Sequence, residues 1–126
     1  MILLTVDEII MLHEKQLLAT GGSAGLRDRG MLESAVYGVN AGLADIERYP
    51  TVEEKAARLA FSLVNNHAFV DGNKRVGILA MLMTLRLNGV TLRYTQAELI
   101  RLGLAIASGA ADTEEILSWI QTHKNN

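Results

Sequence analysis

Residues 67–75 gather the side-chain types that phosphate chemistry requires. The segment carries an imidazole, a carboxylate, a glycine, an amide and two cations, in the order His67, Asp71, Gly72, Asn73, Lys74 and Arg75. A long apolar segment, residues 76–83, follows directly. A polar loop that enters a buried helix offers unpaired backbone N–H groups and the positive end of the helix dipole, and both favour negative charge. The pattern therefore predicts phosphate binding at a helix N-terminus.

The first four of these residues each allow a chemical and a structural interpretation. An unperturbed histidine titrates near physiological pH, so His67 can take a proton from an attacking hydroxyl, or it can simply bond to the backbone. Asp71 can ligate Mg²⁺ or cap the following helix. Gly72 lets the backbone approach a phosphate or serves as an ordinary turn glycine. Asn73 can donate its side-chain amide, and its backbone N–H begins the helix. We favour the chemical interpretation because all these residue types occur together.

Lys74 and Arg75 are expected in the first turn of that helix, where positive charge opposes the helix dipole. A lysine–arginine pair on a helix surface is usually only solvated. Here a bound anion would remove the conflict with the dipole, and the arginine fork can grip phosphate oxygens at two places. Both cations are therefore predicted to bind phosphate.

The bulk composition narrows the class of protein. The chain has 126 residues, a formal net charge of −2 and no cysteine. The nearly neutral charge provides no basic field for direct nucleic-acid binding, and the lack of cysteine excludes disulfides and thiolate metal sites. No apolar run approaches the ~20 residues of a membrane span, and no signal peptide is recognisable. We expect a single cytoplasmic domain over residues 1–126 that does not bind a membrane.

Cap and stop signals predict a compact all-α bundle of about six helices. Thr-x-x-Glu capping boxes begin at Thr5, Thr51 and Thr95, Asp28 and Asp112 are further caps, and glycines mark the helix ends. The expected helices lie near residues 6–19, 29–40, 52–66, 73–88, 96–108 and 113–123. Residues 90–94 are β-prone and form a candidate extended segment.

Two of these helices should hold the phosphate segment in place. The helix at 73–88 carries apolar residues on all sides, which is typical of a buried helix. The helix at 52–66 has one apolar stripe and should pack beside it. Because these helices flank residues 67–75, the predicted site is held rigidly between packed elements.

At these residues the chain resembles the Fic/Doc family. The family signature reads His-x-Phe-x-(Asp/Glu)-Gly-Asn-Gly-Arg-x-x-Arg, and this chain matches it at His67, Phe69, Asp71, Gly72, Asn73 and Arg75. Lys74 replaces the second glycine and Ile78 replaces the last arginine, as in the Doc branch of "death on curing" toxins. Residues 21–35 and 49–57 also look like Doc-type proteins, so the resemblance covers most of the chain.

The resemblance implies a helical Fic/Doc fold and a transferase reaction. Doc-type proteins transfer the γ-phosphate of ATP to a threonine of translation elongation factor Tu and arrest protein synthesis, whereas most Fic proteins transfer AMP. A lysine at position 74 would crowd the place of the β-phosphate and reverse the nucleotide. The carried-over roles are a catalytic base for His67, Mg²⁺ binding for Asp71, and ATP binding for Gly72, Asn73, Lys74 and Arg75.

Regulation and target binding are also expectations from the resemblance. The inhibitory signature (Ser/Thr)-x-x-x-Glu-(Gly/Asn) of many Fic proteins is absent from this sequence. Inhibition is therefore expected in trans, from a Phd-like antitoxin whose tail folds into a groove of apolar and basic side chains. Residues 40–50 would form a short β-like flap that aligns the target peptide as an added strand, or else a plain surface loop.

Three other functions are weighed against a Doc-type kinase. An AMP transferase would use the same site with the other nucleotide orientation, and Gly72 is the glycine found in Fic proteins. A non-catalytic binding module would carry a degenerate motif, against which the intact motif residues argue. A metal hydrolase is disfavoured, because His13 and His123 are expected in outer helices and no set of three ligands can be assembled.

Overall fold

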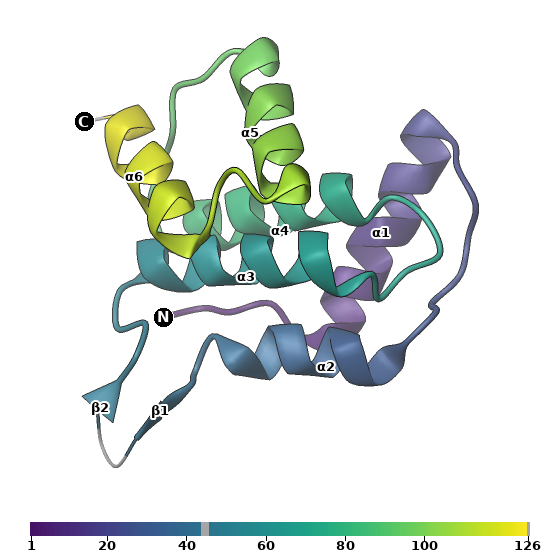
Figure 1. Ribbon diagram of the computed structural model, residues 1–126, viewed down its shortest axis with the longest axis horizontal. Coiled ribbons are helices and arrows are strands. Elements are labelled where there is room, and N and C mark those ends of the chain that lie inside the picture. Colours follow the sequence, from purple (N-terminus) through teal and green to yellow (C-terminus); the bar gives the residue numbers. More distant parts are fainter. Residues whose placement is uncertain (44–45, 126) are drawn as a thin grey trace.

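The computed structural model describes residues 1–43 and 46–125 and shows an all-α fold. The described elements (Figure 1) are α1 (Val6–Thr20), α2 (Arg29–Gly38), β1 (Gly42–Leu43), β2 (Ile46–Glu47), α3 (Val52–Asn66), α4 (Asn73–Leu87), α5 (Gln96–Ser108) and α6 (Thr113–His123). The predicted helical bundle is confirmed, and the predicted helix bounds agree within two residues. None of the described helices is both long and apolar enough to cross a membrane.

Local side-chain contacts begin most of these helices. The predicted Thr-x-x-Glu capping boxes are present at the starts of α1, α3 and α5. In each, the threonine side-chain oxygen accepts from the glutamate backbone N–H, and the glutamate carboxylate accepts from the threonine backbone N–H. Asp112 forms the same kind of box with Glu115 at α6, and Asp28 caps α2. Each box satisfies two N–H groups that helix geometry leaves unpaired. The helix starts therefore depend on residues within three positions of one another.

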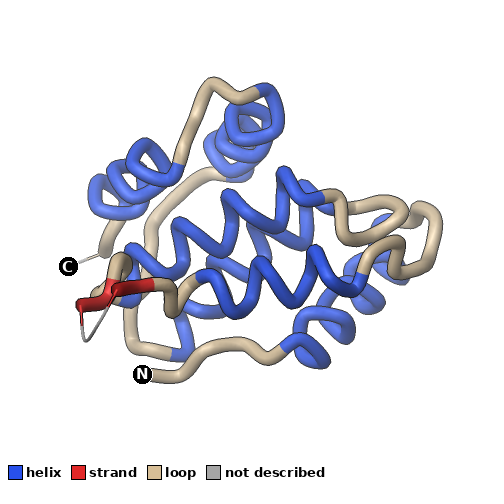
Figure 2. The backbone as a smooth tube through the Cα atoms, turned by 60° about the horizontal axis from the view of Figure 1, so that its bottom comes forward, coloured by secondary structure: helices blue, strands red, loops and turns tan. Residues whose placement is uncertain are grey.

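Helices α3 and α4 lie side by side at the centre of the bundle, between α1 and α2 on one side and α5 and α6 on the other (Figures 1 and 2). Gly77 permits this close approach, because a Cβ at that position would lie 2.7 Å from Cγ2 of Val64. Met83 and Leu87 on α4 nevertheless remain exposed. The expectation that α4 is buried on all sides is therefore wrong, because the neighbouring helices leave part of its C-terminal half uncovered.

The predicted β-like flap exists, but it lies far from the predicted site. Strands β1 and β2 pair antiparallel, with Gly42 opposite Glu47, and residues 44–45 of the expected flap lie outside the described part. This pair precedes α3, whereas His67 follows it, and a helix of 15 residues spans about 22 Å. Figure 1 shows the strand pair and the α3–α4 loop at opposite ends of α3. The alignment of a target peptide by this pair stays a prediction, and the strands lie at the end of α3 away from His67.

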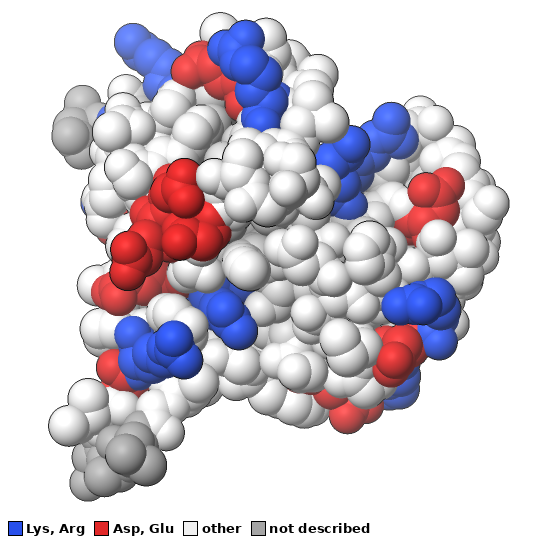
Figure 3. Space-filling view, viewed as in Figure 1, with Lys and Arg blue, Asp and Glu red and all other residues white. Residues whose placement is uncertain are grey.

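Residues 90–94 are extended but form no strand within the described chain. Leu92 makes an isolated antiparallel bridge with Lys124, and the backbone N–H of Arg93 donates to the main-chain oxygen of His123. The segment thus pairs with the last residue of α6 and with the residues that follow it. On the face shown in Figure 3, acidic and basic side chains form small separate groups, and this face carries no continuous basic surface.

Candidate active site

The α3–α4 loop begins with a backbone conformation that is rare for histidine. His67 ends α3 in the left-handed region, with φ 50° and ψ 46°, and within the described chain no other non-glycine residue has a positive φ. Such a conformation costs of order 1 kcal/mol and persists only where surrounding contacts hold it. The residue is exposed, and its imidazole makes no hydrogen bond to the described residues. The ring is therefore accessible to a substrate hydroxyl.

Asp71 is an exposed carboxylate that stays ionised. Its Oδ2 atom accepts from the backbone N–H of Ser23 at 3.1 Å, and its Oδ1 atom accepts from the N–H of Gly72 at 2.8 Å. These two hydrogen bonds, with that from Ser23 the larger cause, hold the pKa of Asp71 below its usual value. The N-cap of α4 is Gly72, and no side chain caps that helix. The first turn of α4 consequently keeps backbone N–H groups that an anion can use.

Asn73 closes the loop rather than facing a ligand. Its Oδ1 atom accepts from the backbone N–H of Phe69 at 3.0 Å, and its Nδ2 atom donates to the main-chain oxygen of Phe69 at 2.9 Å. Phe69 is itself buried, with 2% of its surface exposed. The amide that the sequence assigns to phosphate binding is therefore engaged within the loop, and Asn73 can offer a phosphate only its backbone N–H.

Lys74 and Arg75 are exposed in the first turn of α4, as the sequence predicts. The Nη1 atom of Arg75 donates to Oγ1 of Thr20 at 3.0 Å, which ties the guanidinium to the last turn of α1. The aliphatic part of Lys74 lies against α5, where a Cβ on Gly103 would come within 3.1 Å of its Cγ. Both cations border a cavity of about 600 Å³ between α1, α4 and α5. This cavity combines positive charge with the apolar side chains of Ile78, Leu79, Leu99 and Ile100.

Helix α1 contributes a histidine that sequence reasoning missed. His13 is buried rather than outer: it is 2% exposed, and its Nε2 atom lies 2.7 Å from the main-chain oxygen of Asp71. Its ring stacks on Phe69 with centroids 3.8 Å apart. The signal was present in the sequence, because Ile9, His13 and Gln16 recur at helical spacing on one face of α1. A polar residue on such a buried face needs a partner, and here the partner is the site loop.

The α1–α2 connection forms a second brace along the site loop. The backbone N–H groups of Arg27 and Asp28 both donate to the oxygen of Ala68, at 2.7 and 2.9 Å, and Val70 donates to Gly25 at 3.0 Å. The Nε atom of Arg27 also donates to the main-chain oxygen of His67, at 2.8 Å. Residues 25–28 therefore hold the loop through contacts from a distant segment of the chain, which no local pattern reveals.

The described side chains do not form a complete metal site. Within residues 1–43 and 46–125, no three His, Asp or Glu side chains are arranged to hold a metal ion. A single exposed carboxylate fits Mg²⁺, which is commonly bound through one or two carboxylates together with substrate phosphates. Asp71 would thus bind the ion jointly with a nucleotide, and the arrangement suits transfer of a phosphorus group to a hydroxyl near His67.

Comparison with known proteins gives results that agree with this geometry. The family model described as "Fic/DOC family" matches residues 3–85. The chain is 44% identical over 75 residues to "Toxin Doc" of Mycolicibacterium smegmatis, a match that covers 60% of this chain and 58% of that protein. It is 30% identical over 110 residues to "Protein kinase doc" of Escherichia phage P1, a match that covers 87% of this chain and 86% of that protein. The match thus spans less than two thirds of the first relative and most of the second.

Proposed function

Because the chain belongs to the Fic/Doc family, we propose that it is a Doc-type toxin kinase that transfers the γ-phosphate of ATP to a threonine hydroxyl of elongation factor Tu. The observation that carries this proposal is the position of Lys74. Its side chain stands in the first turn of α4, beside the uncapped N-terminus, where a glycine would leave a nest for another phosphate. The likeness to the phage protein named a kinase supports phosphoryl transfer over AMP transfer.

The proposed reaction begins at His67 and ends with ADP. The imidazole accepts the proton of the threonine hydroxyl, whose oxygen bonds to the γ-phosphorus while the bond from that phosphorus to the bridging oxygen breaks. Mg²⁺, when bound by Asp71 and the phosphates, neutralises charge on the phosphate oxygens. Arg75, Lys74 and the backbone N–H of Asn73 stabilise the transferring group. Positioning and electrostatics of this kind carry most of the catalysis of phosphoryl transfer.

The cavity between α1, α4 and α5 is the proposed contact for a Phd-like antitoxin. Its lining combines apolar side chains with Lys74 and Arg75, which is the composition expected for the groove that receives an antitoxin tail. Ile100, which lines the cavity, and Leu104, one turn further along α5, are 62% and 51% exposed. An antitoxin bound there would cover both motif cations and block the nucleotide directly, so no inhibitory segment of the toxin itself is needed.

An AMP transferase remains the second candidate, and one observation favours it. Gly72, the Fic-type glycine, takes a left-handed conformation with φ 78° at the start of α4. The site would then use the same base and cations with the nucleotide reversed. The two candidates differ in which phosphorus atom of ATP the target hydroxyl attacks.

The test is transfer from ATP and Mg²⁺ to purified elongation factor Tu, read by intact mass of the target. A gain of one phosphoryl group that is absent with His67→Ala supports the kinase, and a gain of one AMP supports the second candidate. Arg75→Ala should impair transfer, while Arg86→Ala, in the last turn of the same helix, should not. No gain on this target would reject elongation factor Tu as the substrate and point to another target or to a binding role.

A further inference from the structure

We infer that Arg27 is a positioning residue for His67, and this inference rests on the proposed function of the site. Arg27 lies in the α1–α2 connection, 40 residues from the histidine, and its Nε atom donates to the main-chain oxygen of His67 at 2.8 Å. The contact thus reaches the catalytic base through its backbone. It leaves the imidazole free to meet the substrate.

The strained conformation of His67 gives this hydrogen bond its importance. A left-handed φ of 50° on a residue with a Cβ persists only if neighbouring contacts outweigh its cost. The carbonyl groups at the end of a helix also lack partners within the helix and carry the negative end of its dipole. A guanidinium at the end of α3 satisfies one such carbonyl and matches the sign of the dipole. The same contact therefore stabilises the turn that aims the imidazole.

The backbone on both sides of Arg27 fixes where its side chain starts. Its own N–H and that of Asp28 donate to Ala68, the residue after the histidine, at 2.7 and 2.9 Å. Leu26 forms an isolated antiparallel bridge with Phe69. The side chain of Arg27 consequently projects from a backbone segment that is already paired to the loop. Little further conformational entropy is lost when it bonds to His67. A preorganised support of this kind keeps a reactive group in its productive geometry.

Charge pairing does not explain the placement of Arg27. Arg29, two residues later, ion-pairs with both Asp7 and Glu33, as an exposed arginine commonly does. Among the described residues, Arg27 makes no ion pair, and its one side-chain hydrogen bond goes to a carbonyl. The two arginines are both exposed, both use Nε and lie on the same stretch of chain. Arg29 is therefore a matched control for a role specific to the site.

The experiment compares Arg27→Ala, Arg27→Lys and Arg29→Ala in phosphoryl transfer to elongation factor Tu. Loss of a hydrogen bond to a charged donor predicts a fall in kcat of about tenfold or more for Arg27→Ala. The KM for ATP should stay within about twofold, because the phosphate-binding groups are untouched. Arg27→Lys should have a kcat between those of Arg27→Ala and the unaltered protein, because a lysine ammonium lacks the guanidinium Nε–H donor. Arg29→Ala should keep the kcat of the unaltered protein.

Chemical rescue separates positioning from general destabilisation. Ethylguanidinium at millimolar concentration should restore part of the kcat of Arg27→Ala and none of that of His67→Ala. A kcat for Arg27→Ala close to that of the unaltered protein, an equal loss in Arg29→Ala, or a joint rise of KM and fall of thermal stability without rescue would overturn the inference.

A second readout keeps the inference testable if elongation factor Tu is not modified at all. The carbonyl ¹³C resonance of His67 reports its hydrogen bond directly and needs no substrate. It should shift in Arg27→Ala and stay in place in Arg29→Ala. A shift without transfer would reject the proposed target and keep the contact, whereas an unchanged resonance would reject the contact itself.

Discussion

The Nε2 atom of His13 lies 2.7 Å from the main-chain oxygen of Asp71, which joins α1 to the site loop across 58 residues of sequence. A carbonyl oxygen only accepts, so Nε2 carries the proton of this hydrogen bond. The imidazole stacks on Phe69 at the same time. One buried side chain thus holds the backbone of the proposed metal ligand and the aromatic anchor of the loop.

Replacing His13 with phenylalanine should lower kcat while the protein remains folded. The new ring can keep the stack on Phe69 but leaves the Asp71 oxygen without this donor, at a cost of about 1–3 kcal/mol in unfolding free energy. His123→Phe is the matched control, because His123 also stacks on an aromatic ring, Trp119, and bonds to a main-chain oxygen. Urea unfolding should show a lower free energy of unfolding for both variants. Only His13→Phe should reduce kcat. Equal kcat values in the two variants would contradict the role of His13.

Substituting alanine for Gly72 should destabilise the protein through two separable effects. A Cβ at Gly72 would lie 2.8 Å from Oε1 of the buried Gln16, and its φ of 78° already disfavours a side chain. Gly89 has φ 79° with nothing within 4 Å, so Gly89→Ala measures the conformational cost alone, about 1 kcal/mol. Gly72→Ala should cost more than that. In the double variant with Gln16→Ala, Gly72→Ala should cost no more than Gly89→Ala does. If the losses of unfolding free energy of Gly72→Ala and Gln16→Ala simply add in the double variant, the steric contact is disproved.

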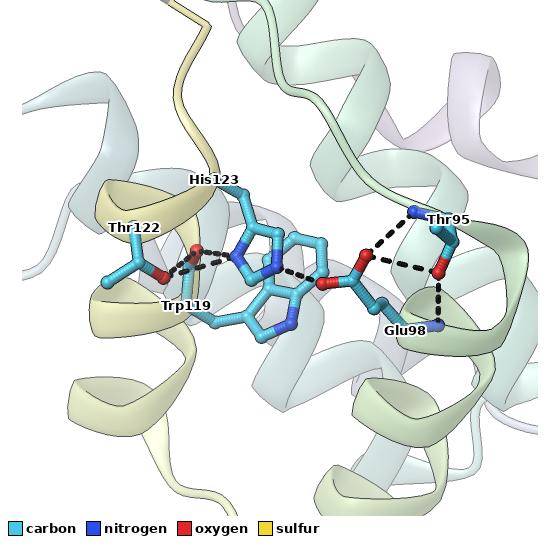
Figure 4. Close-up of polar contacts among 5 residues, drawn as sticks. All are labelled: Thr95, Glu98, Trp119, Thr122 and His123. Carbon is cyan, nitrogen blue, oxygen red and sulfur yellow. Dashed lines mark hydrogen bonds and ion pairs between the residues drawn. The ribbon is translucent and has the colours of Figure 1, made fainter.

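Acid should remove the contribution of Glu98 to stability. His123 Nε2 lies 2.7 Å from Oε2 of Glu98, and Thr95 donates to the same carboxylate through its N–H and its hydroxyl (Figure 4). The hydrogen bond from His123, followed by those from Thr95, lowers the pKa of Glu98 from 4.5 to about 2. A lowered folded-state pKa means that the stabilisation is complete above pH 4.5 and is lost as the pH falls towards 2.

Urea unfolding of Glu98→Gln at neutral and acid pH checks this expectation. The difference in unfolding free energy between Glu98→Gln and the unaltered protein should be largest at neutral pH. It should shrink as the pH falls from 4.5 towards 2. Glu115→Gln serves as the control, because Glu115 closes a capping box at α6 that involves no histidine. Its difference from the unaltered protein should depend less on pH, and parallel behaviour of both variants would argue against the His123 contact.

Glycine at position 67 should stabilise the fold relative to alanine. Because His67 has φ 50°, His67→Gly avoids the cost of a Cβ in the left-handed region, about 1 kcal/mol, that His67→Ala retains. Both variants should lose transfer activity, because both lack the imidazole. At Asn65, within the last turn of α3, the order should reverse, since glycine costs about 1 kcal/mol in a helix. Thermal unfolding of the glycine and alanine variants at positions 67 and 65 compares the two sites. The same order of stability at both positions would exclude the left-handed turn.

The helices and the reactive segment can be recognised in the sequence because their determinants are local. A capping box such as Thr51 with Glu54 operates over three residues, and the helix starts it predicts are the ones observed. The site residues 67–75 are nearly consecutive, so the loop keeps His67, Asp71, Lys74 and Arg75 close together in any fold that preserves it. The chemistry that we propose for this loop rests on these residue types.

The tertiary structure alone decided which residues support the site and which do not. His13 and Arg27 reach the loop only because α1 and the connection after it pack against α3 and α4. The amide of Asn73 bonds to the backbone of Phe69, four residues earlier in the loop, and only the folded loop shows this choice of partner. The β1–β2 pair lies away from the site because the length of α3 separates them. Contacts between distant segments depend on how helices pack, and that packing is a property of the whole chain rather than of any short pattern in it.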